Sequence, residues 1–90
     1  MQYAAICIDK ENSEHIRLEN RADHIEHLKK VRDHMLLAGP FLTDEGRMCG
    51  SLLVFNDLPL EDIKQWLDQD PYNKADLFQS VEVKPFKKVI

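Results

Sequence analysis

Apolar side chains recur at steps of three and four residues through the second quarter of the chain, the spacing of one face of an α-helix. This pattern predicts one long helix over residues 20–38 that supplies much of the core. Asn20 is its expected N-cap. Gly39-Pro40 is the expected stop, because glycine accepts a left-handed C′ conformation and proline cannot continue a helix. The apolar series is Leu18, Ala22, Ile25, Leu28, Val31, Met35 and Leu36.

The other apolar segments are shorter and predict strands and a second helix. Strands are expected at 3–8, 41–43, 51–55 and 78–84. The second helix opens at 57–59 and ends at Asp70-Pro71, because the residue before proline avoids the helical region. Short helical turns are expected at 13–19 and 72–75. The order βαββαβ predicts an α+β, ferredoxin-like fold with a four-stranded antiparallel sheet.

The first and third expected strands are apolar on both of their faces. Ile6 and Cys7 point to opposite sides of the sheet, as do Leu53 and Val54. These are the central strands of this topology, and two helices can cover only one sheet face. The second face would be a large exposed apolar patch. We therefore expect a homodimer in which two sheets pack face to face.

Length and composition narrow the class of protein. Ninety residues with 43% apolar and 31% charged side chains fit one soluble domain over 1–90. The 16 acidic and 12 basic residues give a net charge of −4, which disfavours nucleic-acid binding. No apolar run reaches the roughly 20 residues that cross a bilayer, and we expect no signal peptide. Two cysteines are too few for a disulfide framework, which fits a reducing cytoplasm.

His24 is the residue with the strongest chemical signal. It falls inside the apolar arc of the expected long helix, whereas His27 falls just outside it and His34 further out. We expect His24 to be partly buried and the other two to meet solvent. A partly buried imidazole needs hydrogen-bond partners. Two interpretations stay open: a core histidine bonded to a backbone carbonyl, or a general acid or base.

No motif points to a metal or a cofactor. His24 and His27 are three residues apart but lie on different sides of the apolar boundary, and no H-E-x-x-H pattern occurs. The three glycines form no G-x-G-x-x-G array. We expect neither a bound metal nor a cofactor.

Several short motifs, in order along nearly the whole chain, resemble those of the YCII (YciI-like) family. The resemblance implies a dimeric α/β barrel of the ferredoxin-like type. It also implies a candidate small-molecule enzyme with a His-Asp pair in a cleft, and by position this pair is His24 and Asp70. Some family members are thought to be lyase-like and to act on small cyclic acids. The loop 43–50 is shorter than the family's usual insert, which weakens the case for a substrate contact there. The motifs are Arg21-x-x-His24-x-x-x-Leu28, Gly39-Pro40, Gly50-Ser51, Asp70-Pro71-Tyr72 and Val83-Lys84-Pro85-Phe86-Lys87-Lys88-Val89.

Each further site residue has a structural alternative beside its functional role. Asp70 can orient His24 or simply end a helix before proline. Ser51 can donate to a ligand oxyanion or bond locally within its strand. Arg21 can bind a substrate carboxylate or form a surface ion pair. Tyr72 can close the cleft or pack against the second helix.

The sequence thus predicts a cytoplasmic homodimeric enzyme that binds a small molecule. His24 and Asp70 would perform acid–base chemistry in the elimination, isomerisation or hydrolysis of a small anionic or cyclic metabolite. The alternative is a noncatalytic dimeric module that binds a small ligand or a protein partner.

Overall fold

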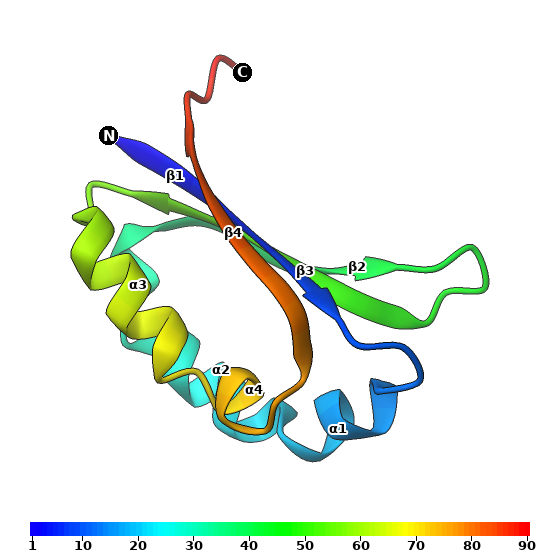
Figure 1. Ribbon diagram of the computed structural model, residues 1–90. Coiled ribbons are helices and arrows are strands. Elements are labelled where there is room, and N and C mark those ends of the chain that lie inside the picture. The colour runs from blue at the N-terminus through cyan, green and yellow to red at the C-terminus, as the bar shows by residue number, and fades with distance from the viewer.

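One four-stranded antiparallel sheet carries all the helices on one side (Figure 1). The computed structural model describes the whole chain, residues 1–90. The strand order β2-β3-β1-β4 confirms the predicted α+β, ferredoxin-like fold. The elements are β1 (Gln2–Asp9), α1 (Glu14–Glu19), α2 (Arg21–Lys29), the 3₁₀ turn η1 (Arg32–His34), β2 (Met35–Leu42), β3 (Met48–Asn56), α3 (Leu60–Asp68), α4 (Pro71–Lys74) and β4 (Phe78–Phe86).

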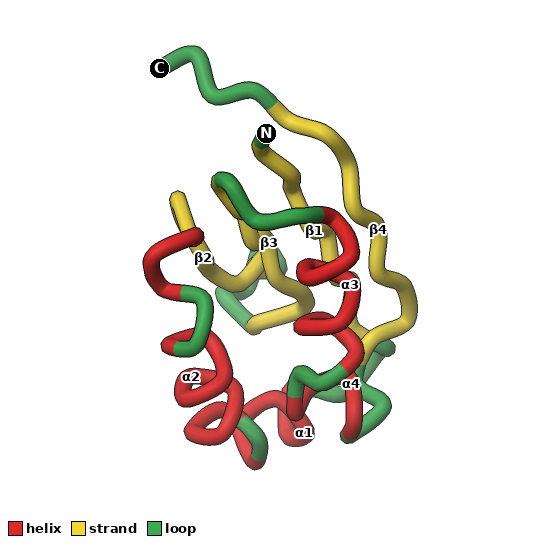
Figure 2. Tube along the Cα trace, turned by 90° about the vertical axis from the view of Figure 1, so that its left-hand side faces the viewer, coloured by secondary structure: helices red, strands yellow, loops and turns green.

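The two most apolar strands, β1 and β3, are the central strands, as predicted. Ala5 lies opposite Leu53, and Cys7 lies opposite Ser51. Directly paired residues share a sheet face, so these four side chains point to the inner face, toward the helices. Figure 2 shows the helices on this side, and no element of the chain covers the outer face.

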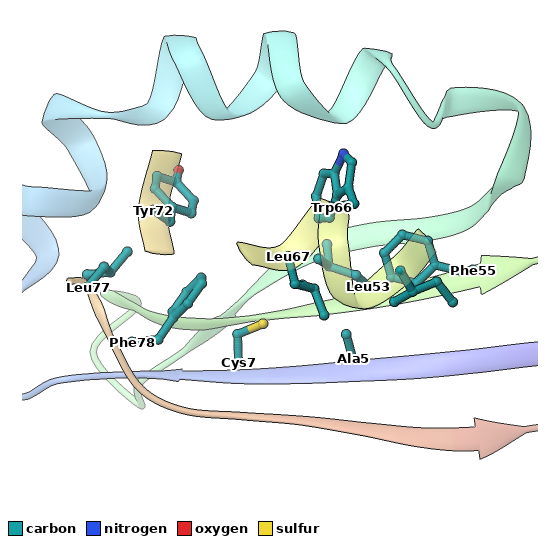
Figure 3. Packing of buried hydrophobic residues seen from close by; sticks show 10 residues of the cluster. Ala5, Cys7, Leu53, Phe55, Trp66, Leu67, Tyr72, Leu77 and Phe78 are labelled. Atoms are coloured by element: carbon teal, nitrogen blue, oxygen red, sulfur yellow. The ribbon is translucent and has the colours of Figure 1, made fainter. Parts of the chain in front are cut away.

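The core fills the space between the inner sheet face and the helices. Tyr72 and Trp66 lie between the strands and α2 (Figure 3). Side chains from every strand except β2 meet there with α3 and the segment that follows it. The cluster consists of Ala5, Cys7, Leu53, Phe55, Ile63, Trp66, Leu67, Tyr72, Leu77 and Phe78.

The predicted long helix over 20–38 is wrong in its second half. α2 ends at Lys29, and Met35 begins β2, which pairs with β3. A short apolar run fits a helix or a strand equally well, and the backbone hydrogen bonds to β3 decide for the strand. Gly39 and Pro40 therefore lie inside β2 rather than ending a helix. β2 is an edge strand, where a proline without N–H is tolerated.

The buried face of α2 also differs from the prediction. Its buried residues are His24 and His27, while Ile25 is more exposed than the apolar pattern suggests. His24 is buried more completely than the partial burial that we expected. His27 was expected to meet solvent, which is wrong: it is only 5% exposed because its ring packs against Trp66. His34 is partly buried as well, near the backbone carbonyl of Asn56.

The remaining elements lie close to their predicted positions. The turn at 13–19 is α1, the second helix is α3, and the turn at 72–75 is α4. Of the two cysteines, Cys7 is fully buried and Cys49 is partly buried. No helix is both long and apolar enough to cross a membrane.

Candidate functional site

A cavity of about 150 Å³ lies beneath α2, against the inner faces of β2 and β3. About half of its lining is apolar. Its polar wall contains four of the five site residues predicted from the sequence, together with Arg17, which the sequence did not point to. The full lining is Arg17, Arg21, His24, Ile25, Leu28, Ala38, Gly39, Pro40, Met48, Ser51, Leu53 and Tyr72.

His24 and Asp70 form a buried hydrogen-bonded pair. His24 Nδ1 lies 2.8 Å from Asp70 Oδ1, and the two residues are 6% and 0% exposed. His24 comes from the first half of α2, and Asp70 from the junction of α3 and α4. The fold therefore joins two residues that are 46 positions apart. Asp70 is the one predicted site residue that does not line the cavity, because it lies behind His24.

This pairing determines which imidazole nitrogen is available to a ligand. An ionised carboxylate only accepts hydrogen bonds, so His24 Nδ1 is the donor and Nε2 is unprotonated in the neutral ring. His24 Nε2 has no hydrogen-bond partner within the chain. Nε2 is not among the fully enclosed polar atoms that lack a partner, so it keeps some accessible surface, and His24 is one of the residues that line the cavity.

Asp70 has a structural role in addition to its contact with His24. It is the N-cap of α4, where its Oδ1 accepts a hydrogen bond from the backbone N–H of Tyr72 at 3.0 Å. Pro71 occupies the first helical position, which suits its fixed φ and missing N–H. The same Asp70 oxygen therefore contacts His24 and caps the short helix that follows.

Tyr72 joins the two halves of the polar wall. Its ring stacks on His24 with centroids 3.9 Å apart and an interplanar angle of 15°. Burial raises the pKa of the Tyr72 hydroxyl above its usual value, and the charge of Arg17 only partly opposes this. The hydroxyl is therefore neutral near pH 7 and can donate a hydrogen bond, but it is a poor candidate for a base.

Arg17 and Asp9 form a second buried pair, which the sequence did not reveal. Arg17 Nε and Nη2 donate to the two Asp9 oxygens, each at 2.8 Å. The guanidinium carbon lies 4.6 Å from the centre of the Tyr72 ring. Burial is the largest influence on the Arg17 pKa and lowers it, but the bond and charge of Asp9, aided by Tyr72, outweigh burial and raise it. No local pattern marked Arg17, because its partner ends the preceding strand, eight residues earlier.

Ser51 and Arg21 occupy different depths of the cavity. Ser51 is buried on β3, while Arg21 is exposed at the start of α2 and contributes to the rim. The strands approach closely beside Ser51, since a Cβ added at Gly50 would overlap the Cys7 carbonyl oxygen. Gly50 therefore allows β3 to bring Ser51 against β1.

Cys7 lies behind this site but is chemically inert near neutral pH. Burial raises its pKa to about 12, and the charge of Asp70 adds to this effect. A thiol with such a pKa is protonated near pH 7 and is therefore a poor nucleophile. No group of three or more His, Cys, Asp or Glu side chains is placed to hold a metal ion.

Comparisons with known proteins agree with the motifs. Residues 1–87 match the family model of the YCII-related domain. Protein YciI of Escherichia coli O6:H1 is 36% identical over 97 residues, with 99% of each chain covered. A Haemophilus influenzae protein is 35% identical over the same length, again with 99% of each chain covered.

A solved structure is similar over nearly the whole fold. It is the 5-chloro-2-hydroxyhydroquinone dehydrochlorinase from Burkholderia phenoliruptrix AC1100, in complex with 2,5-dihydroxybenzoquinone. The two folds agree with a TM-score of 0.88 at 27% identity, covering 97% of this chain and 94% of that chain. Family model, curated relatives and fold thus agree, and the chain belongs to the YCII-related domain family.

Proposed function

We propose that this protein is a small-molecule enzyme in which His24 is the general base or acid and Asp70 orients it. The observation that carries the proposal is the 2.8 Å bond between His24 Nδ1 and Asp70, which leaves Nε2 without a partner in a residue that lines the cavity. A histidine in this arrangement can take a proton from a bound molecule and return it later. The reaction is an elimination, isomerisation or hydrolysis.

The charges around the cavity suit removal of a proton from the substrate. Arg17 and Asp9 neutralise each other, and Asp70 Oδ2 has no partner within the chain. When Nε2 accepts a proton, the imidazolium lies against a carboxylate that is otherwise incompletely compensated. The site gains one positive charge as the substrate becomes an anion. In an elimination, the electron pair left behind forms the new double bond, and the leaving group departs with its own pair.

The cavity size limits the substrate to a small molecule. About 150 Å³ is the volume of an apolar protein cavity known to hold benzene, so a single six-membered ring fits. The apolar half of the wall would contact the ring, and Ser51, Tyr72 and Arg21 would bind its polar groups. The similar dehydrochlorinase acts on a chlorinated ring compound, which supports a small cyclic, anionic metabolite for this chain.

We also propose that the protein works as a homodimer joined through the outer sheet faces. Ile8 and Leu37 are 40% and 50% exposed on this side of the sheet. Ile6 and Leu52 lie beside them, so β1, β2 and β3 form an apolar strip on the outer face, bordered by the polar residues Ser80, Glu82 and Lys84 of β4. No helix covers this strip (Figure 2). Both cysteines are free, which suits a cytoplasmic enzyme.

The test is a turnover assay with single-ring hydroxylated compounds, including 5-chloro-2-hydroxyhydroquinone. Chloride release and ultraviolet absorbance would be followed for the wild type, His24→Ala, Asp70→Asn and the control His15→Gln, since His15 is exposed on α1. We expect the first two variants to lose on the order of 10²- to 10⁴-fold in kcat with an unchanged circular dichroism spectrum. Full activity in Asp70→Asn would remove Asp70 from the mechanism. Ligand binding without any turnover would favour the noncatalytic module.

A further inference from the structure

We infer that Arg17 binds an anionic oxygen of the substrate, so that the site selects a planar ring with an acidic hydroxyl or carboxylate group. This inference rests on the proposed function and specifies its substrate class. Arg17 would be the residue that distinguishes an anionic ring from a neutral ring of the same size.

The guanidinium has donors that the chain does not use. Of the five N–H groups of an arginine side chain, Asp9 accepts two, from Nε and Nη2. The Tyr72 hydroxyl is also placed as an acceptor for the guanidinium, and the chain's other side chains accept nothing further from it. Asp70 Oδ2 is the only fully enclosed side-chain polar atom that lacks a partner. Nη1 is therefore not fully enclosed. Since Arg17 lines the cavity, a ligand there would be within reach of the N–H groups that remain.

The orientation of Arg17 is fixed before any ligand binds. Both bonds to Asp9 are 2.8 Å long, which sets the plane of the guanidinium, and its carbon lies over the Tyr72 ring. Arg17 is only 2% exposed, so its side chain cannot turn away to solvent. A preorganised donor loses little conformational entropy on binding, and arginine is suited to planar oxyanions.

A purely structural ion pair explains this arrangement less well. Moving two charges out of water is costly, and apolar residues of similar size often replace a buried ion pair without loss of stability. Arg17 and Asp9 would tie α1 to β1, but that task needs no unused donors beside a cavity. The position of the pair favours ligand binding over a role in the fold alone.

Arg17 and His24 can reach the same small molecule. The His24 ring centroid lies 3.9 Å, and the Arg17 guanidinium carbon 4.6 Å, from the centre of the Tyr72 ring. Both residues also line the same small cavity, so a single ring there would place an anionic oxygen at Arg17 and present an acidic proton to His24. Such a substrate carries at least one acidic oxygen in addition to the proton that is removed.

The experiment compares two ring compounds by isothermal titration calorimetry at pH 7. The anionic probe is 2,5-dihydroxybenzoquinone and the neutral probe is hydroquinone. The test variant is Asp9→Leu/Arg17→Met, which replaces the ion pair by apolar side chains and leaves no unpaired buried charge. All proteins carry Cys49→Ser, so that the partly buried thiol does not react with the quinone.

We expect the wild type to bind the anionic probe more tightly than the neutral one. The test variant should weaken anion binding on the order of 10- to 100-fold and change hydroquinone binding by less than about threefold. The affinity of Arg17→Lys for the anionic probe should lie between those of the wild type and the test variant, because the ammonium keeps the charge but loses the planar guanidinium. The control Lys10→Met/Asp76→Asn removes the exposed ion pair of 2.6 Å and should leave both affinities unchanged.

Three results would overturn the inference. They are unchanged anion binding in the test variant, equal weakening of both probes, and a wild type that binds neither probe. If the test variant does not fold, Arg17→Lys becomes the test. An Arg17→Lys variant that prefers the anionic probe over hydroquinone as strongly as the wild type does would count against Arg17. Failure of the proposed function would be seen separately, as turnover that survives His24→Ala, because the Arg17 test measures only dissociation constants.

Discussion

Replacing His27 by phenylalanine tests how the structure holds α2 against α3. His27 Nε2 lies 2.7 Å from the backbone carbonyl of Trp66, and Trp66 Nε1 donates to the carbonyl of His27 at 3.0 Å. The two rings stack with centroids 4.4 Å apart. The N–H groups of Gln69 and Asp70 bond to other carbonyls, so His27 supplies the hydrogen bond that the Trp66 carbonyl lacks near the end of α3.

The expected loss follows from this one contact. Phenylalanine keeps a ring for the stack but leaves the Trp66 carbonyl without a donor. An unpaired buried acceptor costs about 1–3 kcal/mol of unfolding free energy. For a domain of this length, each kcal/mol lowers Tm by about 4–8 °C, so His27→Phe should lower Tm by roughly 4–24 °C.

The assay is thermal and urea unfolding followed by the fluorescence of Trp66, the single tryptophan of the chain. All samples are compared at one protein concentration, since dimerisation would make Tm depend on concentration. His15→Phe is the control, because His15 is exposed and its replacement should change stability by less than about 0.5 kcal/mol. A His27→Phe variant as stable as the wild type would show that the contact to Trp66 contributes nothing.

Four further predictions concern residues of the sheet. In the native protein Cys49 should react with Ellman's reagent, whereas Cys7 should react only after unfolding. Burial raises the Cys7 pKa from 9.0 to about 12, so the unfolded state loses the thiol proton at a lower pH than the native state. The free energy of unfolding should therefore fall as pH rises from 9 to 12. A Cys7→Ala variant whose unfolding free energy falls equally steeply with pH would refute this. Gly50→Ala should cost about 1–3 kcal/mol through its clash with the Cys7 carbonyl, whereas Gly39→Ala, with open space around it, should cost far less; urea unfolding of both variants checks this. Leu37→Lys on the outer sheet face should convert the dimer to a folded monomer in light scattering, and a wild type that is already monomeric at micromolar concentration would contradict the proposed interface.

The order of the elements was predictable because local sequence patterns mark most strands and helices where the structure has them. β1 and β3 are apolar on both faces, which only central strands require, and Asp70-Pro71 does mark the end of a helix. The fold then brings His24 and Asp70 together without any local signal that they are neighbours. Their pairing came from motif resemblance and not from periodicity.

The parts that failed depend on tertiary contacts. Met35 to Ala38 became a strand because β3 offers backbone hydrogen bonds along its open edge. His27 is buried because Trp66, 39 residues away, provides both a stacking surface and a carbonyl. Arg17 was missed for the same reason: its importance depends on a cavity formed by other elements. Amphipathic periodicity cannot foresee a buried face that is built from histidines.

The most direct test of the His24–Asp70 pair is the nitrogen-15 NMR spectrum of the His24 ring, assigned by comparison with His24→Gln. We predict that neutral His24 is protonated at Nδ1 and bare at Nε2, and that 2,5-dihydroxybenzoquinone shifts the Nε2 resonance. Asp70→Asn should reduce the preference for this tautomer, because a neutral amide is a weaker acceptor than a carboxylate. A His24 protonated at Nε2 would leave no base facing the cavity and would contradict the proposed chemistry.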